Sequence, residues 1–196
     1  LELREITKWK VPIFIKVAGA RPYYDTALAV KAGADVVVLD GMQGGTAATQ
    51  EVFIENVGQP TLACIRPAVD ALQDLNAHRE VQLVISGGVR NGADVAKALA
   101  LGADAVSIGS AAMIAIGDND PKWEKEYQKL GTKAGAYDDW HEGNDPAGIS
   151  TQNPKLMKRL DPKKAGRKLS NYLKVMTLEA QTIARACGKN SLHNLE

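Results

Sequence analysis

Four short apolar runs constrain the fold of this chain more than any other feature. Each run is nearly continuous and is rich in valine, isoleucine or alanine. They are Val11–Val17, Val36–Leu39, Val81–Ile85 and Ala105–Ile108. A strand with one solvated face alternates apolar and polar residues, whereas a strand covered on both faces does not. Helical patterns lie between these runs, at Tyr24–Ala32, Ala68–Asn76 and Gly92–Leu101. The alternation of strands and helices predicts an α/β fold with a parallel sheet.

An internal repeat narrows this prediction. Segments 29–41 and 98–110, offset by 69 residues, share a helix end, the triplet Gly-Ala-Asp and the start of a strand. Two βα units of about 30 residues each span such an offset. Gly33 and Gly102 stand where a left-handed residue commonly ends a helix. The repeat favours a TIM-type (β/α)8 barrel over a doubly wound open sheet, because no Gly-x-Gly-x-x-Gly motif follows any strand.

Four strands are only half of such a barrel, which closes with eight. We therefore expect residues 1–116 to form the C-terminal half, strands 5 to 8, and residues 117–196 to form a C-terminal helical extension. The extension has a turn-rich insert and a long helix at Pro162–Cys187, with Asp161 as N-cap and Gly188 after its end. Half a barrel has two open sheet edges, which invite pairing. The missing N-terminal half is expected on the same longer chain, on a separate subunit or on a second copy in an oligomer.

The composition excludes several classes of protein. A net charge of +1 gives no field for nucleic acid or an anionic membrane, and no apolar run approaches the roughly 20 residues of a membrane helix. Cys64 and Cys187 fit neither a disulfide framework nor a metal motif, which favours a reducing, cytoplasmic compartment. The basic stretch Lys155–Lys168 is interpreted as a solvated helix face.

Functional groups of a βα barrel gather where its strands end. The residues found there are Lys16, Arg21, Asp40, Gly44, Gly45, Thr46, Ser86, Gly87, Gly88, Gly109 and Ser110. Glycines after the last two strands let backbone N–H groups approach a phosphate, although they also serve tight turns. Lys16 suits a flavin, a substrate or an ion pair. The Gly44–Thr46 loop offers donors to a carboxylate substrate, or is a flexible connector. No metal is expected, because the surroundings of His141 fit no ligand spacing.

Several of these segments, in this order, resemble the FMN-binding domain of glutamate synthases and of N-methylglutamate synthase subunits. They are Lys16, Ala32–Asp35, Asp40–Thr46, Ser86–Arg90, Ile108–Ser110 and the run 146–154. The resemblance implies that Ser86, Gly87, Gly88, Gly109 and Ser110 bind FMN and that Lys16 lies by the flavin or the imino acid. Arg21, Asp40, Gly44, Gly45 and Thr46 would bind substrate. The implied reaction reduces a 2-iminoglutarate-like intermediate, formed from 2-oxoglutarate and an amine donor, to an amino acid.

The sequence departs from the family at its iron–sulfur ligands. The family carries three cysteines before the segment that starts here at Pro146, and the corresponding positions hold Ala134, Trp140 and Asp145. None supplies a sulfur ligand, so no iron–sulfur cluster is expected. Two alternatives to the FMN-dependent oxidoreductase remain open: a flavin-free, phosphate-binding isomerase or lyase, and a non-catalytic scaffold subunit.

Overall fold

The computed structural model describes residues 2–44, 50–137 and 139–196, which group into two compact units. The first unit contains Leu1–Ile108 and Met176–Glu196, and the second contains Gly109–Val175. This grouping by contact does not test the domain division expected after residue 116, which stays a prediction.

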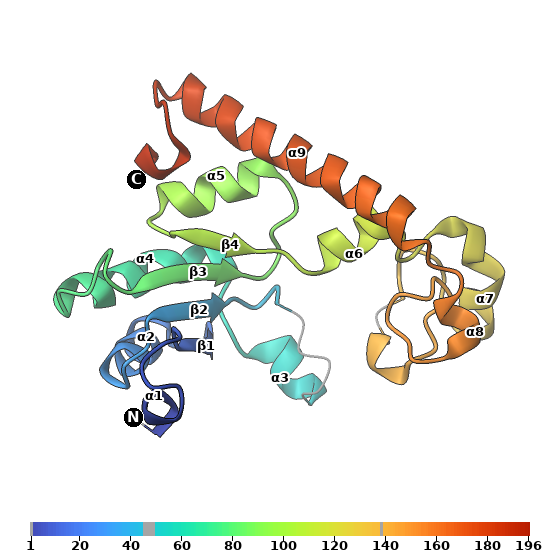
Figure 1. Ribbon diagram of the computed structural model, residues 1–196, viewed down its shortest axis with the longest axis horizontal. Helices are drawn as coiled ribbons and strands as arrows, with labels where there is room; N and C mark the ends of the chain where they lie inside the picture. Colours follow the sequence, from blue (N-terminus) through green and yellow to red (C-terminus); the bar gives the residue numbers. More distant parts are fainter. Residues whose placement is uncertain (1, 45–49, 138) are drawn as a thin grey trace. The chain divides into compact units, whose positions relative to one another are not determined.

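The first unit is built on a parallel sheet of four strands in the order β1-β2-β3-β4 (Figure 1). The strands are β1 (Phe14–Ala18), β2 (Val36–Asp40), β3 (Gln82–Ser86) and β4 (Ala105–Ser107). Each lies at one of the four apolar runs, so the predicted α/β class with a parallel sheet is confirmed. The first strand begins three residues later than predicted, and Val11 is about half exposed.

Helices precede, connect and follow these strands. They are α1 (Glu2–Ile6), α2 (Pro22–Lys31), α3 (Glu51–Asn56), α4 (Thr61–Asp74) and α5 (Gly92–Ala100), and a short 3-10 helix, η3, follows at Leu192–Asn194. The predicted helix at Ala68–Asn76 was wrong at its start, because α4 begins at Thr61 and accommodates Pro67 in its interior. The short helix α3 was not predicted.

The core of the first unit lies on one face of the sheet. Val37, Leu39, Leu83 and Ile85 are at most 1 % exposed and pack with Ile65 and other residues of α4. The opposite face carries two rows of neighbours in register: Lys16, Val38, Val84 and Ala105, then Ala18, Asp40, Ser86 and Ser107. We call these eight residues the open face, because each is exposed or only half-buried. In a closed barrel such a face lines the interior.

The repeated Gly-Ala-Asp triplet forms the same joint twice. Gly33 has φ +90° and Gly102 has φ +106°, so both adopt the predicted left-handed conformation. The aspartate that follows each accepts a backbone hydrogen bond from the neighbouring strand segment. Asp35 accepts from the N–H of Ile13 at 2.6 Å and Asp104 from the N–H of Leu83 at 2.8 Å. Each joint therefore ends a helix and fastens the new strand to the previous one.

The second unit is mainly helical. Its elements are α6 (Ser110–Ile116), η1 (Pro121–Trp123), α7 (Glu124–Lys129), η2 (Trp140–Glu142), α8 (Pro154–Met157) and the first part of α9 (Pro162–Ala186). The predicted long helix is confirmed to within one residue, and Asp161 caps it by accepting hydrogen bonds from the N–H groups of Lys163 and Lys164. No helix in the described ranges is long and apolar enough to cross a membrane.

Candidate functional site

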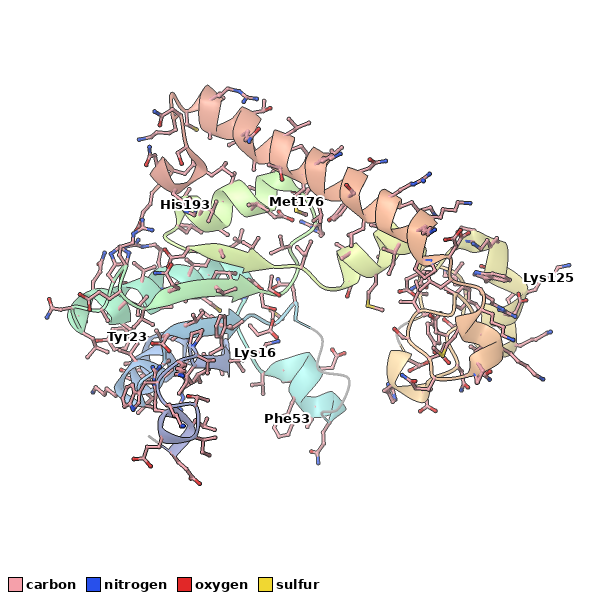
Figure 2. All side chains as sticks on the ribbon, viewed as in Figure 1. Lys16, Tyr23, Phe53, Lys125, Met176 and His193 are labelled. Atoms are coloured by element: carbon pink, nitrogen blue, oxygen red, sulfur yellow. The ribbon has the colours of Figure 1, made fainter. Side chains whose placement is uncertain are left out.

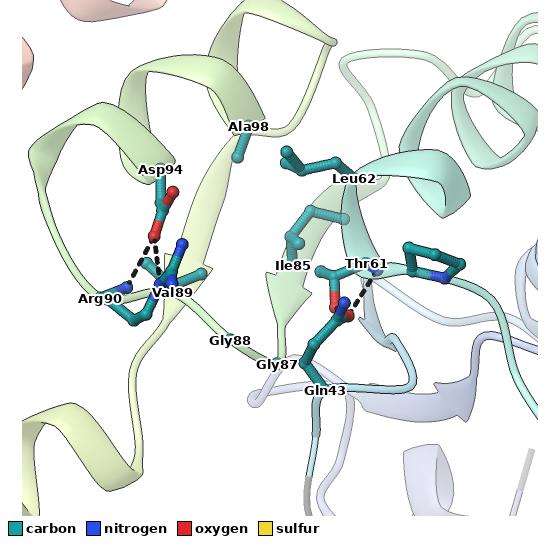
Figure 3. A pocket seen from close by; sticks show the side chains of 11 residues that line it. Gln43, Thr61, Leu62, Ile85, Gly87, Gly88, Val89, Arg90, Asp94 and Ala98 are labelled. Atoms are coloured by element: carbon teal, nitrogen blue, oxygen red, sulfur yellow. Dashed lines mark hydrogen bonds and ion pairs between the residues drawn. The ribbon is translucent and has the colours of Figure 1, made fainter. Parts of the chain in front are cut away.

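Two cavities lie at the carboxyl end of the sheet in the first unit. One, of about 410 Å³, is lined by Lys16, Asp40, Gly44, Phe53 and neighbouring residues, and we call it the Lys16 cavity (Figure 2). The other, of about 300 Å³, includes Gly87, Gly88 and Arg90, and we call it the Gly87 cavity (Figure 3). Gln43 lines both cavities, so they adjoin.

An ion pair between two strands dominates the Lys16 cavity. Lys16 Nζ lies 2.7 Å from Asp40 Oδ2, and the lysine side chain is 60 % exposed whereas that of the aspartate is 12 % exposed. Asp40 Oδ1 is buried and has no hydrogen-bond partner among the described residues. A buried carboxylate oxygen without a donor is costly, so it is a natural acceptor for a donor that a bound molecule supplies.

Glycines surround this carboxylate because no larger residue fits. A Cβ atom on Gly44 would lie 2.0 Å from Asp40 Oδ1. A Cβ atom on Gly87 would lie 2.8 Å from the backbone nitrogen of Gly44 and 3.2 Å from the same oxygen, and Gly87 has φ +104°. The loops that follow β2 and β3 therefore meet at Asp40. Close packing against Asp40 therefore explains the glycines of these loops, as the approach of a ligand would.

The Gly87 cavity has fixed polar groups at its edge. Gln43 Oε1 accepts hydrogen bonds from both the backbone N–H and the hydroxyl of Thr61, each at 2.8 Å. Arg90 donates from its backbone N–H and its Nε to Asp94 Oδ2, each at 3.1 Å, while its side chain stays 75 % exposed. Figure 3 shows both arrangements on either side of Gly87 and Gly88.

The structure brings together only some of the residues predicted from the sequence. Lys16, Asp40 and Gly44 share one cavity, and Gly87 and Gly88 share the other. Ser86 is the register partner of Asp40 on the open face. Arg21 lies at the start of α2, pairs with Asp25 at 2.9 Å and lines neither cavity. Gly45 and Thr46 lie outside the described residues.

Gly109 and Ser110 belong to the second unit. Gly109 precedes α6, no side chain caps that helix, and a Cβ atom on Gly109 would meet no atom within 4 Å. The backbone there is open rather than enclosed by the chain. Such an opening suits the approach of an anion to backbone N–H groups.

Some residues of the two cavities were not predicted from the sequence. Phe53 and Asp94 line a cavity, and so do Gln43 and Arg90, which were noted only as parts of motifs. Gln43 and Arg90 stand in the same loops as the predicted residues, so their position was a usable signal. Phe53 comes from the unpredicted helix α3 and had none.

Comparison with known proteins identifies the family. The conserved region in glutamate synthase matches residues 1–122 and 135–190. The chain belongs to the glutamate synthase family. It is 84 % identical over 196 residues to a glutamate synthase large subunit-like protein of Rhizobium meliloti, and it covers 44 % of that protein. It is 38 % identical over 194 residues to the archaeal glutamate synthase [NADPH] of Methanocaldococcus jannaschii, of which it covers 35 %. This family member thus spans less than half the length of these relatives.

Solved structures support the fold assignment. A mutant flavocytochrome b2 with pyruvate bound matches all of this glutamate synthase family chain with a TM-score of 0.60 at 19 % identity, over 36 % of its own length. A mandelate oxidase mutant with the monooxide FMN adduct matches 99 % of the chain with a TM-score of 0.57 at 21 % identity. These likenesses confirm the predicted α/β fold, a part of a TIM-type barrel.

The three positions where the resemblance places the family's cluster cysteines hold Ala134, Trp140 and Asp145. Asp145 is fully buried, and its carboxylate accepts hydrogen bonds from the backbone N–H groups of Ala147, Ile149 and Ser150 at 2.7–3.0 Å. Residues 109–175 contain no cysteine. Within the described ranges, no group of three His, Cys, Asp or Glu side chains is placed to hold a metal. The carboxylate of Asp145 is thus already used to organise the turn.

Proposed function

We propose that this chain is the C-terminal half of the FMN-binding barrel of a glutamate-synthase-like oxidoreductase, which reduces a 2-iminoglutarate-type intermediate to an amino acid. The observation that carries the proposal is the Lys16–Asp40 pair, at the carboxyl end of a parallel sheet in a chain of this family. A cation and a buried, partly unpaired carboxylate suit a substrate that carries both negative charge and N–H donors. We also propose a cytoplasmic location, since two separated thiols favour a reducing compartment.

FMN fits the residues at the strand ends. Gly87 and Gly88 expose backbone beside a cavity, and Gly109 has open space around its Cα. We assign the phosphate to these glycines, with Ser86 and Ser110 as further contacts, and the inclusion of Gly109 and Ser110 rests on the sequence pattern. Bound FMN supplies the hydride chemistry that amino-acid side chains lack.

The residues of the Lys16 cavity have separate roles in this proposal. Lys16 provides positive charge beside the flavin or the carboxylate of the intermediate, where negative charge is to be stabilised. Asp40 holds the ammonium group of Lys16 through Oδ2 and offers Oδ1 to an N–H of the imine. Backbone groups of Gly44 bind the remainder of a substrate made from 2-oxoglutarate and an amine. For Gly45, Thr46 and Arg21 the same role rests on the sequence resemblance alone.

The other half of the barrel completes this site. The open face leaves Lys16 and Asp40 at a surface of the sheet with no layer of the first unit over it, among the described residues. Relatives are more than twice as long as this chain, which supports a longer polypeptide or a second subunit as the source of strands 1 to 4.

The cofactor itself provides the first test. We expect the protein assembled with its complementary half to be yellow, with absorbance near about 450 nm, and to release FMN on heating. Chromatography of the released cofactor against standards distinguishes FMN from FAD. FAD alone would contradict the proposal, and a colourless protein would favour the flavin-free isomerase or lyase, or the scaffold subunit.

Replacement of Lys16 provides the second test. Lys16→Ala should leave FMN binding largely intact and lower the flavin midpoint potential, because loss of one charge-assisted contact costs roughly 1.5–3 kcal/mol. Lys31→Ala, at an exposed position in the last turn of α2, is the matched control and should leave the potential unchanged. An unaltered potential in both variants would leave Lys16 with a structural ion pair only.

A further inference from the structure

We propose that the second unit carries a binding site for a phosphate group, separate from the proposed flavin site. The site is a cavity of about 220 Å³ beside the first turns of α9. Lys122, Arg159, Lys164 and Lys168 line it, from three separate segments, and the only carboxylate among the lining residues of this described cavity is Asp161. The inference does not depend on the proposed oxidoreductase function.

Arg159 is the fixed cation of this cavity. One guanidinium nitrogen donates a hydrogen bond to the carbonyl oxygen of Pro146 at 2.8 Å, and the guanidinium carbon lies 4.3 Å from the ring centroid of Trp123. The side chain is 28 % exposed, and Glu126 approaches it at 3.9 Å. A guanidinium held in place by a carbonyl group and a ring loses little freedom when it binds an oxyanion.

Lys164 and Lys168 lie one turn apart on the face of α9 that borders the cavity. Asp161 and Ala165 share this face, and Ala165 is buried, so the small side chain leaves room for a ligand. Lys168 Nζ lies 3.9 Å from the position of a Cβ atom on Gly117, across the cavity from its own helix. Neither lysine has a carboxylate within salt-bridge distance in the described part of the chain.

The charges of the cavity are therefore unbalanced. Lys122 is paired with Asp120 at 3.1 Å, and Arg159 has Glu126 nearby. Asp120 also feels the charge of Lys168, beyond salt-bridge distance, so Lys122 and Lys168 share this one carboxylate. Asp161 uses its carboxylate to cap α9 and gives the lysines no side-chain partner. Like charges one turn apart on a helix repel each other, and the N-terminal end of a helix adds positive potential. A bound anion with several acceptor oxygens would remove this repulsion.

The chemistry of the lining identifies a phosphate group as the ligand. One planar guanidinium and two or three ammonium groups match an oxyanion that accepts hydrogen bonds in several directions. Ala147 and Ile149 add apolar surface at the same cavity, so the organic part of a phosphate monoester also has a place to pack. Free phosphate and a phosphate monoester share this chemistry, and the experiment separates them.

Calorimetric titration of the chain assembled with its complementary barrel half tests the site. The probes are inorganic phosphate and glycerol 3-phosphate, in a buffer without other phosphate, sulfate or free FMN, because FMN is itself a phosphate monoester and would compete for the site. We expect saturable binding, and we expect Lys164→Gln/Lys168→Gln to weaken it at least roughly tenfold. Lys163→Gln/Arg167→Gln also removes two charges from the same helix end but from outside the cavity, so it should change the affinity by less than about twofold. The probe that binds more tightly identifies the source of the phosphate.

Three outcomes would overturn the inference. One is the absence of saturable binding of either probe up to about 10 mM, the range of weak anion contacts. Another is an equal loss of affinity in Lys163→Gln/Arg167→Gln, which would show a general effect of charge. The third is unchanged binding in the double variant, which would place the anion elsewhere. Circular dichroism of each variant controls for folding, and loss of flavin binding alone would leave the inference intact.

Discussion

Two buried threonine hydroxyls of the first unit differ in their hydrogen bonding. Thr26 Oγ1, in α2, is buried without a partner among the described residues, whereas Thr61 Oγ1 bonds to Gln43 at 2.8 Å. Thr26→Val should leave stability unchanged or raise it by up to about 1 kcal/mol, while Thr61→Val should lower it by about 1–2 kcal/mol. Chemical denaturation of both variants measures the difference. Equal losses would mean that Thr26 has a partner in solution.

The sequence indicated the site residues better than it indicated their contacts. Lys16 and Asp40 were both singled out because they stand at strand ends, yet their ion pair was not predicted. The pair depends on the register of β1 with β2. This register places Lys16 beside Val38, and Asp40 follows two residues later on the same face of β2. Similarly, the glycine at position 87 was predicted for a phosphate, whereas the structure shows that Gly44 and Asp40 also exclude a side chain there. Tertiary packing of this kind leaves no local sequence pattern.

At the scale of elements, the joint before β2 should make the free energy of unfolding fall as the pH becomes acidic. The guanidinium of Arg4, with the N–H of Ile13, lowers the pKa of Asp35 below its ordinary value. A lowered folded-state pKa gives stability that is complete above the unfolded pKa and is lost as the pH falls through the folded pKa. Urea titrations at a series of pH values should show a smaller acid-side loss in Asp35→Asn than in the original chain. Asp70→Asn, at an exposed helix pair, is the control and should keep the full loss.

The turn around Asp145 should form without iron. Its carboxylate already accepts three backbone hydrogen bonds, so nothing in this turn requires a metal. Assays for iron and acid-labile sulfide on protein purified without oxygen should read near zero, and a chelator should not change the melting temperature. Asp145→Ala should destabilise the second unit by a few kcal/mol, about 1–3 for each buried donor left unpaired. One cluster per chain would show that the expected ligand positions are wrong.

Local signals explain why most elements could be predicted. Valine-rich runs gave the strands, the Gly-Ala-Asp triplets gave the joints, and Asp161 followed by Pro162 gave the start of α9. The extent of α4 was missed because a proline in a helix interior is unfavourable, and burial of Cys64, Ile65, Ala68, Val69 and Leu72 outweighs that cost. Propensity rules fail where a helix is stabilised mainly by the face it buries.

At the scale of the whole molecule, the open face sets the last prediction. β1 and β4 each pair with one neighbour, and Phe14, in β1, is 59 % exposed. Strands with one unpaired edge and exposed apolar side chains favour association. Residues 1–196 alone should therefore not behave as a cooperatively folding, flavin-binding monomer of 21.0 kDa.

Light scattering and flavin absorbance on the purified chain check this expectation. Addition of a polypeptide that carries the other barrel strands, taken from a longer chain or from a separate subunit, should give a one-to-one complex and restore flavin binding. Val84→Asp, which places a charge on the open face, should prevent that complex, whereas Gln82→Asp, at the exposed start of the same strand, should weaken it less. A monomer that binds flavin without a partner would show that four strands suffice, and it would remove the reason to assign the open face to a missing half barrel.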